Sequence, residues 1–171
     1  MPGTGTLEMA PPPKALLVGG VVLLVTAAVL AWWRTGAPEA LPTSEDLVPA
    51  STKVGSPVYV GVFTAGSEFT RTLHLSGVKV HATSNTSQVT LTPHLCRGGS
   101  LGVTTEPEVF CPELLDPEGQ TFGSGDGIVV EVAGSVPGVA VIDPVRLAFR
   151  ENLHWATLPA GTGAVVQILP R

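Results

Sequence analysis

The stretch VRLAFR, residues 145–150, decides the fold class. Its apolar side chains Val145, Leu147 and Phe149 alternate with arginines and an alanine, so an extended chain would carry one apolar and one polar face. Alternation with a period of two is typical of a β-strand that buries one face in a core. We therefore expect a strand here, and an all-β domain if the surrounding sequence keeps this period.

The same period recurs on both sides of this stretch. Short apolar or alternating runs occupy residues 58–63, 69–75, 78–82, 89–91, 128–132 and 164–169. At Ser76-Gly77 the register slips by one residue, which predicts a bulge or a tight turn. No stretch after Trp33 shows a helical stripe of period 3.6. Residues 54–171 are therefore predicted to form an all-β domain, either a β-sandwich (immunoglobulin-like in form) or a small barrel.

A different kind of segment precedes this domain. Residues 15–33, ALLVGGVVLLVTAAVLAWW, carry no charge and would span roughly 28 Å as a helix, close to the ~30 Å hydrocarbon core of a bilayer. We expect an uncleaved transmembrane helix whose partner is the lipid bilayer. Lys14 on one side and Trp32, Trp33 and Arg34 on the other are the expected interface residues, because indole rings and cationic side chains favour the wet edge of a membrane.

The charges suggest an orientation for this anchor. Residues 35–171 hold 7 Lys and Arg against 13 Asp and Glu, so the domain carries little positive charge to resist export. Both cysteines lie in it, consistent with an oxidising compartment. We expect residues 1–14 to form a short cytoplasmic amino terminus and the β-domain to be extracytoplasmic. Residues 34–53, rich in Pro, Ala and acidic residues, are predicted to be a linker whose ends lie roughly 25 Å apart.

Composition excludes several classes of protein. Of the 171 residues, 44% are hydrophobic and 13% charged, against about 25% charged in a typical soluble domain. This balance excludes a disordered tail, and a net charge of −5 argues against a nucleic-acid partner. The abundance of Ala, Gly, Val and Pro is typical of a GC-rich bacterial genome.

The two cysteines, Cys96 and Cys111, enclose 14 residues in the least strand-like part of the domain. A disulfide across such a loop would contribute about 3 kcal/mol by restricting the unfolded chain. The alternative is a redox pair, which the spacing disfavours because it differs from C-x-x-C. Residues 96–127, where Gly, Thr and acidic residues gather away from the strand pattern, are where we would place a contact surface.

One short stretch matches a catalytic motif. Residues 98–102, GGSLG, match the G-x-S-x-G nucleophile elbow, and Asp126 or Asp143 and then His154 follow in the order of a hydrolase triad. The elbow requires a strand before the serine and a helix after it. Neither is expected in this Gly-rich loop. We therefore expect no catalytic residues and predict that the protein is not an enzyme.

No metal or cofactor is expected either. His94, Cys96 and Cys111 could supply three zinc ligands, but an exported disulfide would use both cysteines. The acidic residues between Glu106 and Asp126 do not have the spacing of an EF-hand. His74 and His81 are expected to face solvent, and Asp126 is expected to cap a β-turn.

The sequence therefore favours a membrane-anchored extracytoplasmic β-domain that acts as a binding or assembly module. One alternative is a small accessory subunit of a larger membrane complex, with the helix making the specific contact. Another is a ligand-binding or enzymatic domain whose site is assembled only by tertiary contacts.

The orientation can be tested on intact cells with a membrane-impermeant thiol reagent. We expect Cys96 and Cys111 to react only after reduction, because an exported disulfide is accessible but oxidised. Labelling that requires cell lysis would place the domain in the cytosol and contradict the prediction.

Overall fold

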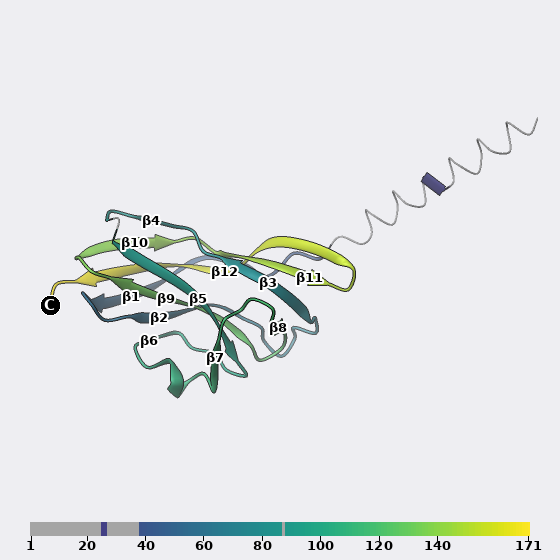
Figure 1. Cartoon of the computed structure of the whole chain (residues 1–171), viewed down its shortest axis with the longest axis horizontal. Coiled ribbons are helices and arrows are strands. Elements are labelled where there is room, and N and C mark those ends of the chain that lie inside the picture. Colours follow the sequence, from purple (N-terminus) through teal and green to yellow (C-terminus); the bar gives the residue numbers. More distant parts are fainter. Residues whose placement is uncertain (1–24, 27–37, 87) are drawn as a thin grey trace, which may run out of the picture. The chain divides into compact units, whose positions relative to one another are not determined.

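Two β-sheets built from residues 38–171 face each other across a shared core (Figure 1). The structure is a computed structural model that describes residues 25–26, 38–86 and 88–171. Its strands are β1 (Thr43–Lys53), β2 (Val58–Thr64), β3 (Leu73–Lys79), β4 (Ala82–Ser84), β5 (Val89–Arg97), β6 (Val103–Thr104), β7 (Glu113–Leu115), β8 (Thr121–Phe122), β9 (Gly127–Gly134), β10 (Gly138–Ile142), β11 (Val145–Glu151) and β12 (His154–Leu169), with a 3-10 helix η1 (Pro107–Val109). The predicted all-β domain is confirmed.

The expected membrane segment falls almost wholly outside the described residues. This applies to residues 1–14, to the interface residues Lys14, Trp32, Trp33 and Arg34, and to residues 15–33 apart from Val25 and Thr26, which are helical. Within the described part of the chain, no helix is long and apolar enough to cross a membrane. The anchor therefore stays a prediction.

The larger sheet is organised by β12. β11 and β10, separated only by Asp143 and Pro144, pair antiparallel with its first and second halves. β1 pairs parallel with the second half, from Thr43 opposite Gly161 to Lys53 opposite Leu169. β3 and β4 pair with β11 and β10, and β8 pairs with the start of β3. The smaller sheet has the order β6-β2-β9-β5-β7.

The residues predicted to share apolar faces meet between the sheets. Buried there are Val58, Val60 and Val62 of β2, Leu73 and Leu75 of β3, Ile128, Val130 and Val132 of β9, and Val145, Leu147 and Phe149 of β11. Phe122 stacks on Phe63 with ring centroids 5.4 Å apart, at one end of this core. Period-two alternation placed these side chains correctly because each strand has one face toward the opposite sheet.

The predicted register slip is also present. The pairing of β3 with β11 shifts between Leu75 and Gly77, so that Ser76 has no partner in the ladder. Such a bulge moves the next side chains by one position. Val78 therefore packs against the core as Leu75 does, although the two residues are separated by an odd number of positions.

The predicted linker over residues 34–53 is wrong for its second part, since residues 43–53 form β1. Only Val48, Ala50 and Thr52 turn inward, and the rest of the strand is mostly exposed, so its alternation is too weak to recognise. Its backbone is ordered by the ladder with β12 rather than by its own apolar pattern. The compact domain therefore begins at Pro38.

Two other strand boundaries differ from the prediction. β5 does not end at Pro93 but continues to Arg97. β7 pairs only with Leu95–Arg97, so at Pro93 the strand has one open side, where a missing N–H group breaks no ladder bond. β12 begins ten residues before the apolar run that predicted it. Its first half, which pairs with β11, mixes polar with apolar residues and so lacks a continuous apolar run.

The run expected over residues 69–75 forms a strand only from Leu73, and Arg71, just before it, makes a tertiary contact. Arg71 donates from Nε and Nη2 to the carboxylate of Glu151 at 2.8 and 2.7 Å, and from Nη1 to the carbonyl of Glu39 at 3.0 Å. It thus joins the first described residues of the domain to the end of β11. Bonding to this guanidinium lowers the pKa of Glu151, although burial opposes the shift.

We expect Arg71→Met to destabilise the domain by about 2 kcal/mol at pH 7, because it leaves a largely buried carboxylate unpaired. A carboxyl group with a lowered pKa stabilises the fold above its ordinary pKa of 4.5, and that contribution is lost as the pH falls. The difference between variant and wild type should therefore shrink below pH 4.5. Urea unfolding of the full chain in detergent measures it, with exposed Lys79→Met as the control. A difference that is independent of pH would contradict the assignment.

Candidate functional site

A second, smaller core lies on the outer face of the five-stranded sheet. It consists of Cys96, Leu101, Cys111 and Val129, with Tyr59 and Leu114 packed against it. Val129 and Tyr59 occupy strand positions whose side chains point away from the main core. The chain between β5 and β7, residues 98–112, folds back to cover them, and we call this segment the disulfide loop.

The predicted disulfide is confirmed and fixes both ends of the loop. Cys96 and Cys111 are bonded, with their Cα atoms 5.2 Å apart. The loop also touches β2 directly, since Gly61 donates its N–H to the carbonyl of Gly102 at 2.7 Å. A Cβ atom at position 61 would lie 1.9 Å from the carbonyl oxygen of Leu101. A glycine at position 61 therefore allows the loop to sit on the sheet.

A buried carboxylate holds the start of the loop. Asp126 is 6% exposed and accepts hydrogen bonds from Arg97 at 3.1 Å, from the N–H of Gly98 at 3.0 Å and from the N–H of Gly123 at 3.0 Å. The bond to Gly123 is the turn cap that the sequence predicted. The other two bonds tie this turn to the end of β5, a contact that no local sequence pattern predicts.

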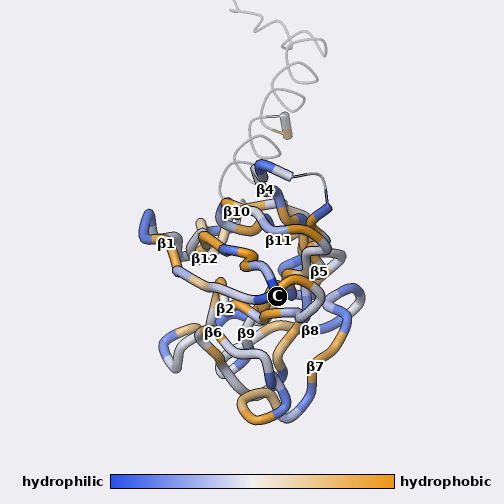
Figure 2. Tube along the Cα trace, turned by 90° about the vertical axis from the view of Figure 1, so that its left-hand side faces the viewer, coloured by the Kyte–Doolittle hydropathy of each residue, from blue (hydrophilic) through white to orange (hydrophobic). Residues whose placement is uncertain are grey.

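The outward side of the loop carries large apolar groups. Val103, Val109 and Phe110 are 42, 69 and 51% exposed. Pro107 is buried beneath them, and its carbonyl accepts the N–H groups of Phe110 and Cys111 at 3.0 and 2.9 Å. Figure 2 shows the resulting hydrophobic stretch in the loop between β6 and β7. The backbone of this turn is therefore fixed by hydrogen bonds, while the side chains of Val109 and Phe110 remain exposed to solvent.

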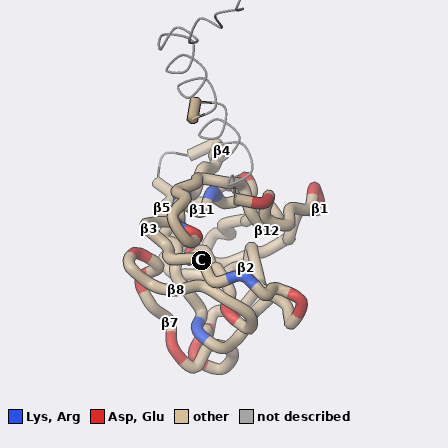
Figure 3. Tube along the Cα trace, turned by 90° about the vertical axis from the view of Figure 1, so that its right-hand side faces the viewer, with Lys and Arg blue, Asp and Glu red and all other residues tan. Residues whose placement is uncertain are grey.

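Exposed acidic residues lie near these apolar residues in the chain, and Figure 3 shows acidic positions on and around β7. Glu106 and Glu108 belong to the same turn as Val109. Burial raises the pKa of Tyr59, and the charges of Glu131 and Glu108 raise it further. Leu101 and Cys111, which lie before and after this turn in the chain, pack with Tyr59, so the turn lies above the outer face of the sheet.

Tyr59, His94 and Glu131 form a polar group beside the loop. His94 Nε2 lies 2.9 Å from a carboxylate oxygen of Glu131, and the Tyr59 and His94 rings are 6.2 Å apart. Both partners of the ion pair are partly covered, at 21 and 28% exposure. These residues lie on the neighbouring strands β2, β5 and β9. Because they are far apart in the sequence, no local pattern predicts that they form a cluster.

The residues considered for a hydrolase triad lie in separate parts of the fold, and both aspartates have other partners. Ser100 is exposed on the disulfide loop, and Asp126 binds Arg97. Asp143 lies 2.8 Å from His81 at the junction of β10 and β11, while His154 begins β12. The structure therefore does not assemble a nucleophile with a base.

The candidate zinc ligands do not form a site either. The disulfide removes Cys96 and Cys111 as thiolate ligands. Across residues 38–86 and 88–171, no three His, Cys, Asp or Glu side chains are grouped to hold a metal ion. His74 and His81 are exposed, as predicted.

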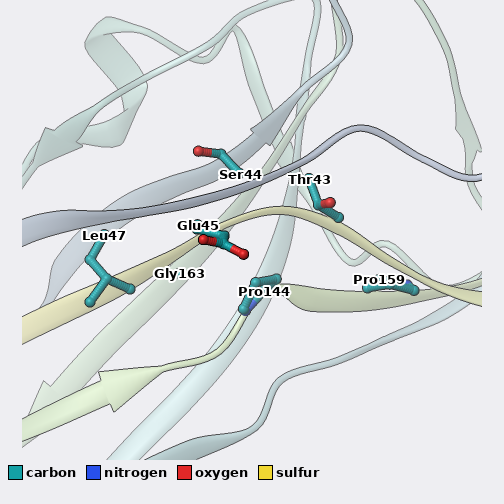
Figure 4. A pocket seen from close by; sticks show the side chains of 7 residues that line it. All are labelled: Thr43, Ser44, Glu45, Leu47, Pro144, Pro159 and Gly163. Carbon is teal, nitrogen blue, oxygen red and sulfur yellow. The ribbon is translucent and has the colours of Figure 1, made fainter.

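A shallow hollow lies beside the start of β1 (Figure 4). Its lining residues are Thr43, Ser44, Glu45, Leu47, Pro144, Pro159 and Gly163. Among them Glu45 alone is ionisable, and Leu47 and Pro144 form apolar walls on either side of it. The hollow lacks the convergent polar groups that orient a small ligand, so the disulfide loop is the stronger candidate.

We expect Asp126→Asn to destabilise the domain by about 2 kcal/mol, because one donor would then face an amide NH2 group instead of an oxygen. Asp116→Asn is the matched control. Asp116 is exposed and accepts one N–H, from Glu118 at 2.9 Å, which Asn can also accept, so the change should stay within about 0.5 kcal/mol. Urea unfolding with the disulfide intact measures both variants. Equal effects would mean that Asp126 does not organise the loop.

Comparison of the chain with known proteins gives no match to a family model, to a curated protein sequence or to a solved structure. Function is therefore inferred from the residues of the disulfide loop and their contacts.

Proposed function

We propose that this chain is a single-pass membrane protein whose extracytoplasmic β-sandwich acts as a binding or assembly module. The disulfide loop would be its recognition surface. The observation that carries the proposal is the braced exposure of Val109 and Phe110. The uncharged run over residues 15–33 supports the anchor, and the Cys96–Cys111 disulfide supports an oxidising compartment.

A rigid exposed aromatic side chain suits recognition for an energetic reason. Most of the binding energy of an interface comes from a few large side chains that enter a pocket. A side chain that is already held in place loses little conformational entropy on binding. Phe110 offers a large exposed side chain, and the hydrogen bonds to Pro107 and the disulfide at Cys111 hold the backbone that carries it.

The charges around Phe110 define the partner that would fit. Glu106 and Glu108 precede the apolar pair in the chain, and Glu113 follows it. A complementary protein would present an apolar pocket with Lys or Arg on its rim. Charges of this kind accelerate association and select the partner more than they add affinity.

One expectation that competes with this proposal is also testable. If the protein is an accessory subunit that works through its helix, replacing residues 15–33 with an unrelated apolar helix would abolish its association. The recognition-loop proposal predicts that association survives this replacement.

Photocrosslinking in the native membrane tests the surface directly. A benzophenone amino acid at position 110 should yield a discrete crosslinked protein, whereas the same group at Val141, exposed on β10 of the other sheet, should not. Phe110→Ser should lower recovery of that protein about tenfold, since the lost apolar burial is worth about 1.4 kcal/mol. Glu108→Gln should weaken association severalfold at low salt only.

The outcomes separate clearly. A product that depends on both Phe110 and Glu108 supports a basic-rimmed apolar partner. Equal products from positions 110 and 141, or recovery unaffected by Phe110→Ser, would overturn the proposed recognition surface.

A further inference from the structure

The turn between β11 and β12 exposes two large apolar side chains. Leu153 is 78% exposed and Trp155 is 69% exposed. Asn152 adopts a left-handed backbone with φ of 53°, and its carbonyl accepts a hydrogen bond from Arg150 at 3.1 Å. The turn is therefore fixed, and the inward positions of this hairpin are already occupied by residues such as Phe149. Neither Leu153 nor Trp155 can turn into the core.

This hairpin tip lies at the same end of the domain as its first residues, which begin at Pro38 (Figure 1). Arg71 binds the carbonyl of Glu39 and the carboxylate of Glu151 with one guanidinium group. Glu151 is two residues before Leu153. The first residues of the domain and the hairpin tip are thus joined through a single side chain.

Because the domain begins at Pro38, the linker between it and the expected anchor is shorter than the sequence predicted. Only residues 34–37 separate Trp33 from Pro38, where the compact domain begins. The five Cα-to-Cα steps from Trp33 to Pro38 reach at most about 18 Å. If residues 15–33 cross the bilayer, as the proposed function requires, the end of the domain that holds Pro38 lies within that reach of the headgroups.

The chemistry of the tip fits such a surface. Trp155 lies directly opposite Arg150 on the outward face of the hairpin, and Arg146 is on the same face. Indole rings favour the membrane interface, and guanidinium groups bind phosphate oxygens in two-pronged contacts. The acid of this turn, Glu151, is already neutralised by Arg71.

We infer that the β11–β12 hairpin tip is a second membrane contact, in which Leu153 and Trp155 enter the headgroup region of the bilayer that holds the anchor. This inference rests on the proposed membrane anchor. In this arrangement the Pro38 end of the domain lies against the membrane, whereas the linker expected from sequence over residues 34–53 would have separated the two.

Tryptophan quenching by lipid bromines tests the contact on the full chain in phosphatidylglycerol-containing nanodiscs. Trp32→Phe with Trp33→Phe leaves Trp155 as the sole tryptophan. Brominated lipid should quench Trp155 at least about twofold and its emission should be blue-shifted, because the indole would sit among acyl chains and headgroups. As a matched control, the same chain with Trp155→Phe and Leu169→Trp places the indole at the other end of β12. That probe should not be quenched.

The Trp155→Phe chain, which keeps Trp32 and Trp33, reports separately on the anchor. Quenching of Trp32 and Trp33 without quenching of Trp155 would overturn the hairpin contact and leave the anchor intact. A blue-shifted but unquenched Trp155 would overturn it in favour of a protein partner, and equal quenching at position 169 would remove its specificity for the tip. Absence of quenching in all variants would overturn the anchor and the contact together.

Discussion

The backbone ladder of β12 is the constraint on which the rest of the domain depends. This strand of sixteen residues pairs with β11, β10 and β1. A strand that supplies hydrogen bonds on both sides fixes the register of its neighbours, and register decides which side chains face the core. Ala160, Ala164 and Val166 are consequently buried, and β1 becomes ordered despite its polar sequence.

The disulfide loop depends on the smaller sheet in a similar way. The outward faces of β2, β9 and β5 offer Tyr59, Val129 and Cys96, which would be exposed without a cover. Leu101 and Cys111 of the disulfide loop pack on these residues. The turn over residues 107–110 lies above them, and its backbone is hydrogen-bonded to Pro107. The same construction that buries one set of apolar groups therefore holds Val109 and Phe110 in solvent. Recognition by this loop, as proposed, would use rigidity that the small core already provides.

The two exposed apolar groups belong to different sheets and suit different partners. Val109 and Phe110 are set among acidic residues, which matches a protein surface with basic side chains. Leu153 and Trp155 stand beside arginines, which matches the phosphates of a bilayer. In the proposed arrangement, the hairpin orients the domain on the membrane while the disulfide loop on the other sheet stays available to a partner.

The sequence alone determined the all-β class, the buried faces of β2, β9 and β11, the bulge near Gly77 and the disulfide, because each leaves a local pattern. The contact region over residues 96–127 stays a prediction, and the exposure of Phe110 within it leaves no local pattern in the sequence. Strand β1, the ion pair of Arg71 with Glu151 and the node at Asp126 were decided only by tertiary structure. Their partners lie far along the chain, at β12, β11 and β5, and local periodicity carries no information about which distant segments will pair.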